Sequence, residues 1–178
     1  AARDAVNAQV GDVMVFVADG SLATVNEVLG RFRVLIAERF NLIPKDVYTA
    51  CWITDFPLFE LNDGQLTSPH HPFTQPTEPV NDGMSQEQLL KMTTRAYDVV
   101  INGQEVGGGS IRIHDSKQQE AIFKLLNLSE DEIEHKFGFF VDALSYGTPP
   151  HGGLAIGIDR LVSIILDTPS IRDVIAFP

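Results

Sequence analysis

The sequence predicts a mixed α/β protein of the α+β class, in which an antiparallel sheet is flanked by helices. The clearest strand signal is a pair of apolar stretches around Asn102-Gly103, the preferred two-residue loop of a type I′ hairpin. Helix starts are indicated by three capping-box pairs, namely Ser85 with Gln88, Ser116 with Gln119, and Ser129 with Glu132. The 178 residues are 44% hydrophobic, which is sufficient for a globular core.

The N-terminal part should contain a strand and then a long amphipathic helix. Asp12–Ala18 is apolar enough for a strand, and Ser21 is a candidate helix N-cap. Beyond Ser21, apolar residues recur at three- and four-residue steps, so we expect one buried helix face. That face comprises Leu22, Val25, Leu29, Phe32, Ile36 and Phe40. Asn41 and Pro44 should end the helix.

The middle of the chain should alternate between strand, loop and helix. Val47–Asp55 is predicted to be a strand, followed by a polar, proline-containing loop through Leu61–Asn81. The helix that begins after Ser129 should end at Gly147, because glycine is a natural C-terminal stop. Its core face should comprise Ile133, Phe137, Phe140, Val141 and Leu144.

Two carboxylates should share one face of the predicted hairpin over Tyr97–Ile113. A two-residue loop sets the register, so Asp98 and Glu105 lie diagonally adjacent on that face. The expected pairs are Ile101 with Gln104, Val100 with Glu105, Val99 with Val106, and Asp98 with Gly107. Adjacent carboxylates repel each other unless a cation lies between them. The pair is therefore either two solvated acids or a cation site.

The run Gly152–Leu161 predicts a buried strand that turns sharply into a helix. Arg160 would lie in the first helical turn, where the positive end of the helix dipole disfavours a cation. A ligand explains a cation at that place more easily than the fold does. The alternative is a strand–helix packing joint that carries an exposed arginine.

Five histidines divide into an adjacent pair and three isolated residues. His70 and His71 lie in an extended segment, so their side chains should point in opposite directions and only one should face a substrate. An ordinary polar loop is the alternative, and a zinc site is disfavoured because the single cysteine, Cys51, is remote in sequence. The remaining residues, predicted to be structural or solvated, are His114, His135 and His151.

Composition excludes several classes of protein. No apolar run approaches the roughly 20 residues that span a bilayer, and no secretory signal pattern is present. A single cysteine allows no internal disulfide, which suits a reducing cytoplasm. The net charge of −11 is a poor match for a surface that grips a phosphate backbone. We therefore expect a cytoplasmic protein without a membrane partner.

The run Gly152–Leu161 resembles motif 3 of the class II aminoacyl-tRNA synthetases. Further segments resemble the bacterial-type aspartyl-tRNA synthetases, in the same order and with short spacings, and extend the match from about Gly11 to Pro178. They are Trp52–Glu60, His70–Pro76, Tyr97–Asp115, Lys136–Leu161 and Ile171–Pro178. The resemblance implies part of the antiparallel sheet of a class II catalytic domain.

The resemblance also implies a division of the chain and an activity. Residues 1–45 correspond to the end of an insertion domain with a connecting helix, and residues 46–178 to the C-terminal half of the catalytic domain. We expect a fragment of a larger homodimeric enzyme, because motifs 1 and 2 and an anticodon-binding domain have no counterpart here. Such an enzyme activates aspartate with ATP to aspartyl-adenylate and transfers it to tRNA. The isolated fragment should be inactive.

The resemblance assigns roles to individual side chains. Three residues would be catalytic: Glu105, Arg112 and Arg160. The carboxylates of Asp98 and Glu105 would hold the Mg²⁺ that accompanies ATP. Glu105 would also belong to the ATP site, whose other members are Gly157, Ile158, Asp159 and Arg160. His70 and Arg112 would bind aspartate, and His71 would belong to the loop that closes over the adenylate.

These roles require an irregular strand. Glu105 and Arg112 are separated by an odd number of steps, so a regular strand would place them on opposite faces. One pocket can hold both only if a bulge flips the alternation, and Gly107, Gly108 and Gly109 are its expected place.

Two other functions fit part of the pattern. A class II sibling that uses asparagine or lysine would share motif 3, but Arg112 and the segment His70–Pro76 argue against it. A truncated, non-catalytic paralogue acting as a binding module is the second alternative.

Overall fold

The computed structural model describes residues 2–178 and divides them into two compact units that meet between Val47 and Tyr48. The assignment of the first unit to an insertion domain stays a prediction. Among the described residues, no helix has both the length and the apolar character that crossing a membrane requires.

The first unit contains two helices, α1 (Ala2–Ala5) and α2 (Leu22–Arg39). As predicted, Ser21 caps α2, its hydroxyl accepting a hydrogen bond of 3.3 Å from the N–H of Thr24. The helix ends at Arg39, and Asn41 follows with a φ of 52°, a left-handed conformation that asparagine tolerates.

Two predictions for this unit are wrong. Asp12–Ala18 forms no strand, because no segment of the described chain pairs with it. The apolar stripe along α2 has the expected spacing, but none of its residues within the described chain is buried. Leu22, for example, is 73% exposed. Periodicity predicts the helix correctly; burial needs a partner surface as well.

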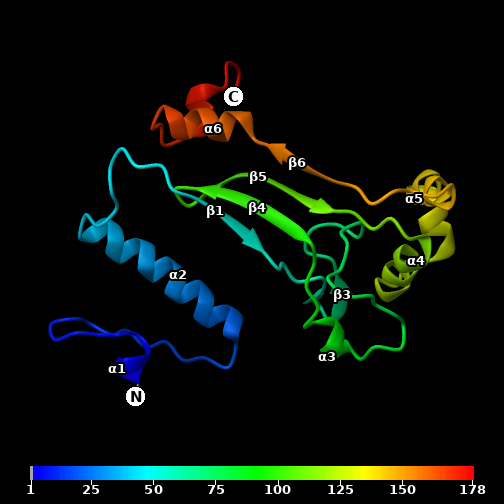
Figure 1. Cartoon of the computed structure of the whole chain (residues 1–178), viewed down its shortest axis with the longest axis horizontal. Coiled ribbons are helices and arrows are strands. Elements are labelled where there is room, and N and C mark those ends of the chain that lie inside the picture. Colours follow the sequence, from blue (N-terminus) through cyan, green and yellow to red (C-terminus); the bar gives the residue numbers. More distant parts are fainter. Residues whose placement is uncertain (1) are drawn as a thin grey trace. The chain divides into compact units, whose positions relative to one another are not determined.

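The second unit is built on a four-stranded antiparallel sheet with the order β1-β4-β5-β6, which confirms the predicted fold class (Figure 1). Its strands are β1 (Ala50–Thr54), β4 (Ala96–Ile101), β5 (Gln104–Ile111) and β6 (Gly152–Ile156). Asn102 and Gly103 have φ values of 49° and 79°, as the predicted hairpin loop requires. The expected burial of β6 is wrong, because β6 is an edge strand and all five of its residues are exposed.

A second, smaller hairpin lies within the segment that the sequence predicts to be a loop. It consists of β2 (Glu60–Asn62) and β3 (Gln65–Thr67), joined by Asp63 and Gly64 with φ values of 50° and 79°. Asp-Gly is itself a hairpin signal, which the polar and proline-rich surroundings obscured.

Helices follow the capping signals. They are α3 (Gln86–Leu89), α4 (Ser116–Leu125) and α5 (Glu130–Ser145). Capping boxes are present at Ser85 and Ser129 as predicted, and Gly147 follows α5 with a φ of 90°. The box predicted at Ser116 is wrong. Asp115 caps α4 instead, its carboxylate accepting from the N–H of Gln118 at 2.8 Å.

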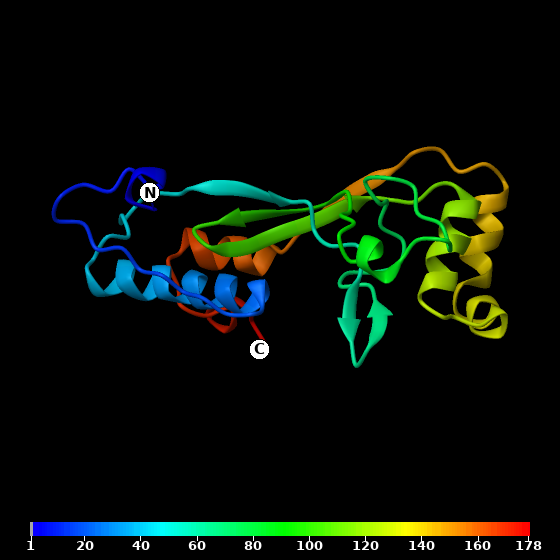
Figure 2. The same cartoon turned by 90° about the horizontal axis from the view of Figure 1, so that it is seen from below.

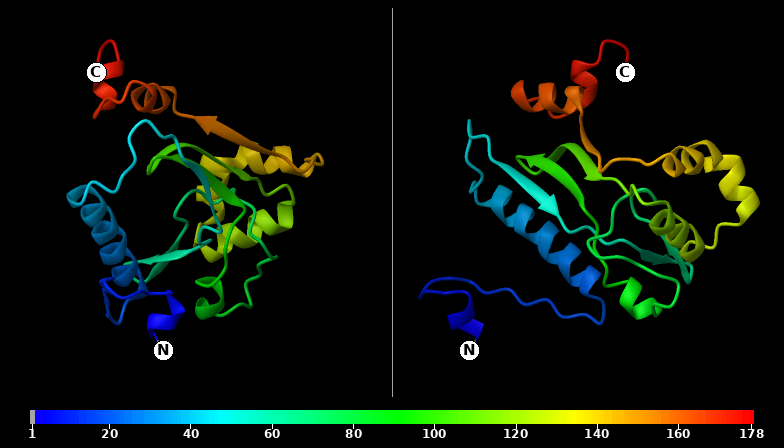
Figure 3. Two further views of the ribbon diagram at one scale, coloured as in Figure 1. Left: turned by 60° about the vertical axis from the view of Figure 1, so that its left-hand side comes forward. Right: turned by 45° about the vertical axis from the view of Figure 1, so that its right-hand side comes forward.

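The core of the second unit lies beside the sheet, not on its faces. It comprises Leu58, Phe59, Val80, Leu89, Ile113 and Ile122. A cluster of aromatic rings from α4, α5 and Phe73 adjoins it, and α4 and α5 pack against each other (Figure 3). Helix α6 (Ile158–Ile165) and the 3-10 helix η1 (Ile171–Val174) lie at the opposite end of the sheet (Figure 2).

Candidate active site

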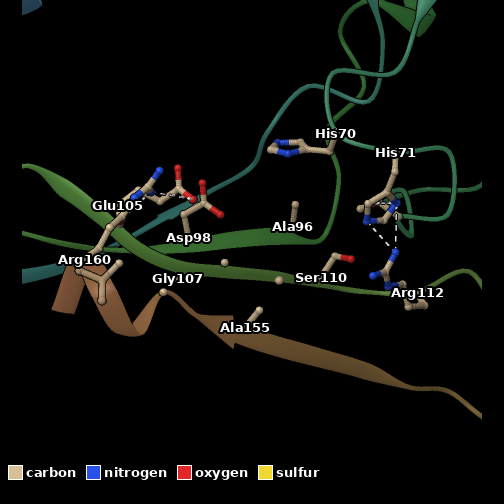
Figure 4. Close-up of a pocket in the computed structure, with 15 residues that line it drawn as sticks. His70, His71, Ala96, Asp98, Glu105, Gly107, Ser110, Arg112, Ala155 and Arg160 are labelled. Carbon is tan, nitrogen blue, oxygen red and sulfur yellow. Dashed lines mark hydrogen bonds and ion pairs between the residues drawn. The ribbon is translucent and has the colours of Figure 1, made fainter. Parts of the chain in front are cut away.

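A pocket of about 420 Å³ opens on one face of the sheet, between the segment that carries His70 and the start of α6. It collects most of the side chains that the sequence singles out (Figure 4). Those present are His70, His71, Asp98, Glu105, Arg112, Gly157 and Arg160. Ile158 and Asp159, expected at the ATP site, are not among its lining residues. Figure 4 shows Arg160, Glu105 and Asp98 at one end and Arg112 with His71 at the other.

A β-bulge brings Glu105 and Arg112 to the same face. The β4–β5 ladder pairs Val100 with Glu105 but Val99 with Gly107, so Val106 is the extra residue. The predicted irregularity is therefore confirmed, although it lies one residue before the glycine run. The two predicted pairs beyond the bulge are corrected accordingly, and Asp98 lies opposite Gly108 instead of Gly107.

The three glycines serve close approach and not the bulge itself. A Cβ atom on Gly108 would overlap the Asp98 carboxylate, and one on Gly109 would overlap the carbonyl oxygen of Gly153 on β6. Gly107 likewise leaves no room beside the carbonyl oxygen of Ala155. The glycines therefore let the acidic side chain and the edge strand lie close against β5.

We call the part of the pocket that is formed by Asp98, Glu105 and Arg160 its open end. It carries two carboxylates and one cation. Arg160 Nη1 donates to the Glu105 carbonyl oxygen at 2.7 Å and lies 3.7 Å from its carboxylate. The Arg160 and Glu105 side chains are 49% and 54% exposed, so this ion pair contributes only about 0–1 kcal/mol. Arg160 therefore has a protein partner, but a weak one that leaves it accessible to a ligand.

The bulge also docks the start of α6. The N–H of Gly157 donates to the Val106 carbonyl oxygen at 2.7 Å, next to the bond from Arg160 to Glu105. Helix α6 begins without a side-chain cap at Gly157. The bulged carbonyls thus hold the turn that presents Arg160 to the pocket.

Mg²⁺ fits the donor set of the open end. Asp98 and Glu105 supply hard carboxylate oxygens on one face, and Mg²⁺ takes one or two carboxylates when phosphate and water complete its shell. Within residues 2–178, no three His, Cys, Asp or Glu side chains form a ready cluster for a metal ion. A metal here would therefore depend on ligands that the nucleotide supplies.

We call the part of the pocket that is formed by Arg112, His71 and Thr74 its closed end. These three residues are at least half-buried. Arg112 Nη1 lies 2.6 Å from His71 Nε2 and 3.1 Å from Nδ1. Among the described residues Arg112 forms no ion pair with the nearby acid Asp115, whose carboxylate caps α4. Arg112 is held from the backbone as well, since its N–H donates to the His151 carbonyl oxygen at 2.9 Å.

His70 and His71 both line the pocket, and the expectation that only one of them faces a substrate stays a prediction. The His70 ring is exposed and packs edge-on against Phe56, with ring centroids 4.7 Å apart. His71 turns toward Arg112 (Figure 4). Burial, the Arg112 guanidinium and His70 lower the pKa of His71 below its ordinary value, which favours the neutral ring.

Ser110 and Thr74 line the pocket as well, although the sequence did not single them out. Both are buried, and the Ser110 hydroxyl has no hydrogen-bond partner among the described residues. Ser110 lies two residues before Arg112, which directly follows the end of β5, and extended chain puts two such side chains on the same face. The alternation of side chains along extended chain could therefore have indicated Ser110. Of the isolated histidines, His135 and His151 are exposed, as expected.

Comparisons with known proteins agree on one family. Residues 22–178 match the family model of the tRNA synthetases class II (D, K and N). The chain is 54% identical over 169 residues to an aspartate–tRNA(Asp/Asn) ligase of Syntrophus aciditrophicus (strain SB), covering 94% of this chain and 23% of that protein. It is 48% identical over 175 residues to an aspartate–tRNA(Asp/Asn) ligase of Sulfurovum sp. (strain NBC37-1), covering 98% of this chain and 29% of that protein.

A solved structure shares the fold. The aspartyl tRNA synthetase from Entamoeba histolytica superposes with a TM-score of 0.55 at 22% identity, over 98% of this chain and 29% of that one. The chain thus spans less than a third of the length of each of these three proteins.

Proposed function

Because the chain belongs to the class II tRNA synthetases of the D, K and N group, we propose that it is part of an aspartate–tRNA ligase. One observation carries this proposal: a single pocket holds a guanidinium at its closed end and two carboxylates with a second guanidinium at its open end. The closed end suits the side-chain carboxylate of aspartate, and the open end suits a nucleotide with its metal ion. Both curated relatives described above are named as ligases for aspartate.

The reaction would need positioning more than proton transfer. The α-carboxylate of aspartate attacks the α-phosphorus of ATP, a bond to the α-phosphoryl group forms, and pyrophosphate leaves. Arg112 would orient the substrate by a bidentate contact with its side-chain carboxylate. A hydroxyl of the terminal ribose of tRNA would then attack the aspartyl carbonyl carbon, the bond to the phosphate would break, and AMP would leave. Rate enhancement of such steps comes mostly from placement and charge stabilisation.

The open end would hold the nucleotide. Asp98 and Glu105 would ligate Mg²⁺, which when bound neutralises phosphate charge. Arg160 would leave its weak contact with Glu105 and bind ATP through phosphate or adenine, while the turn at Gly157 would shape the nucleotide pocket. Ile158 and Asp159 would support that turn from outside the pocket. His70, which lies between the two ends in Figure 4, would contact the aspartate.

Several finer features belong to the same proposal. The full-length protein would act as a cytoplasmic homodimer and bind tRNA. The net charge of −11 makes this chain a poor tRNA-binding surface by itself, so the grip on the nucleic acid would come from other parts of that protein.

Aspartate-dependent exchange of pyrophosphate into ATP, measured with the full-length protein, tests the proposal. We expect exchange with aspartate and little with asparagine or lysine. Exchange that favours asparagine or lysine would assign the protein to a sibling enzyme, and no exchange with any of the three would favour a binding module.

The isolated chain should exchange pyrophosphate poorly. Each missing preorganised contact costs about 10²–10³ in rate, and the resemblance implies that motif 2 supplies one of them. Exchange by the isolated chain at the rate of the full-length protein would contradict this expectation.

A further inference from the structure

We propose that His71 is a positioning residue, whose neutral imidazole orients the Arg112 guanidinium for the substrate carboxylate. This places His71 at the amino-acid end of the pocket and not with the adenylate, where the family resemblance puts it. The inference rests on the proposed function, because it gives Arg112 the carboxylate as its ligand.

The contact itself is the first observation. Arg112 Nη1 lies 2.6 Å from His71 Nε2 (Figure 4), and a guanidinium can only donate. Nδ1 lies 3.1 Å from the same Nη1, so Nε2 is the nearer nitrogen and the better placed of the two to be unprotonated and accept. The proton of the neutral ring is then on Nδ1, which lies 3.3 Å from the Thr74 hydroxyl, an available acceptor. The opposite tautomer would let Nδ1 accept from the Phe73 N–H at 3.2 Å, but it would place the ring N–H 2.6 Å from the cation instead of 3.1 Å.

The second observation is the lack of an acidic partner. Among the ion pairs of residues 2–178, none involves Arg112, and His71 is the side chain that accepts from it. An acidic partner would orient the guanidinium but would also compete with a carboxylate ligand. A neutral acceptor orients it and leaves its full positive charge for that ligand.

His71 is itself rigidly supported. The segment around it pairs with the chain beyond β5, since the N–H of Ile113 donates to the Phe73 carbonyl oxygen at 2.9 Å. The buried amide of Gln119 on α4 donates to the Pro72 carbonyl oxygen at 2.8 Å. These bonds hold the backbone of the two residues that follow the histidine.

An aromatic cluster on α4 and α5 packs against the same segment. Phe73 meets three rings edge-on, with centroid distances of 6.2 Å to Phe123, 5.2 Å to Phe137 and 4.8 Å to Phe140. Such contacts stabilise beyond the area they bury. His71 therefore sits on a platform built by α4 and α5, which suits a side chain that must hold another one still.

The charges around His71 favour the neutral form. Burial, Arg112 and His70 lower its pKa. The aromatic cluster contributes no charge, and the titratable residues that line the second hollow beside Arg112, Lys136 and His151, include no carboxylate. Protonation of His71 would place two cations in contact, so an acidic medium should release Arg112.

Kinetics of the full-length protein test the role. His71→Leu removes the acceptor and should raise KM for aspartate about 10- to 100-fold, the factor for losing a hydrogen bond to a charged group, with KM for ATP within twofold. His71→Gln keeps an acceptor near the position of Nε2 and should recover most of the loss. The control is His135→Gln on the exposed side of α5, which should leave both constants unchanged.

NMR titration of the imidazole nitrogens supplies a readout independent of activity. In Arg112→Leu, the pKa of His71 should rise toward 6.5 and its Nε2 resonance should change, while His135 stays constant. An unchanged His71 pKa would overturn the inference even if His71→Leu failed to fold.

The two proposals fail in different ways. Exchange of pyrophosphate by the wild type, with an unchanged aspartate KM in His71→Leu, would overturn the role of His71 alone. Absence of aspartate-dependent exchange in the wild type would overturn the proposed function and this inference with it.

Discussion

The two ends of the pocket present a guanidinium in opposite ways. At the closed end, Arg112 is half-buried, bonded to a neutral ring and supported by an aromatic cluster. At the open end, Arg160 is 49% exposed and bonded to a backbone carbonyl, with the Glu105 carboxylate at 3.7 Å. The first arginine is fixed before a ligand arrives, whereas the second is held loosely.

This difference relates to what each end would recognise. Selecting one amino-acid side chain requires a fixed geometry, because a misfit must leave polar groups unpaired. A nucleotide with its metal ion brings its own charge and coordination, so the residues that bind it can be ordered by the ligand. Four changes, in order of decreasing expected effect, probe this contrast.

Arg112→Leu should have the largest effect, because it removes the donor pair that matches the aspartate carboxylate. We expect kcat/KM for aspartate to fall about 10⁴-fold while KM for ATP stays nearly constant. Pyrophosphate exchange by the full-length protein measures both constants. Arg172→Leu, at an exposed position in η1, is the matched control. A change of only a few-fold would make Arg112 a structural residue.

Phe123→Ala should weaken the aromatic cluster that supports the closed end. Phe123 is fully buried and stacks on Phe137 at 5.4 Å, so its removal should lower the free energy of unfolding by about 3–5 kcal/mol. Urea unfolding measures this loss. Phe139→Ala, at a ring that is 81% exposed, should cost far less. Equal losses in the two variants would show that the cluster does not support this end.

Glu105→Gln should weaken the open end without unfolding it. Replacing the carboxylate removes a metal ligand, and we expect exchange to fall about 10²–10³-fold and to require more Mg²⁺. The free energy of unfolding should change by no more than about 1 kcal/mol, because the pair with Arg160 is exposed. Glu120→Gln on α4 provides the control. Normal exchange at low Mg²⁺ would remove Glu105 from the metal site.

Asp115→Ala should have the smallest effect of the four changes. It tests which residue caps α4, a helix that supports the closed end. Loss of this N-cap should destabilise α4 by about 1 kcal/mol, whereas Ser116→Ala should have almost none. Thermal unfolding compares the two variants. A larger loss for Ser116→Ala would restore the capping box that the sequence predicts there.

Interactions between near neighbours in the chain could be predicted from the sequence. Ser21, Ser85 and Ser129 cap helices because each accepts from an N–H three residues away. The hairpin loop at Asn102-Gly103 follows from the left-handed conformation that these residues tolerate. Strand alternation also predicted the bulge to within one residue, once Glu105 and Arg112 were required to share a face.

Contacts between distant segments needed the tertiary structure. His71 and Arg112 are 41 residues apart, and no local pattern indicates that they touch. Arg160 reaches a carbonyl 55 residues away, which only the pairing of β5 with β6 makes possible. The predictions of burial for α2 and β6 were wrong for the same reason. Apolar residues in the sequence indicate which side chains could be covered, but the tertiary structure decides whether another surface covers them.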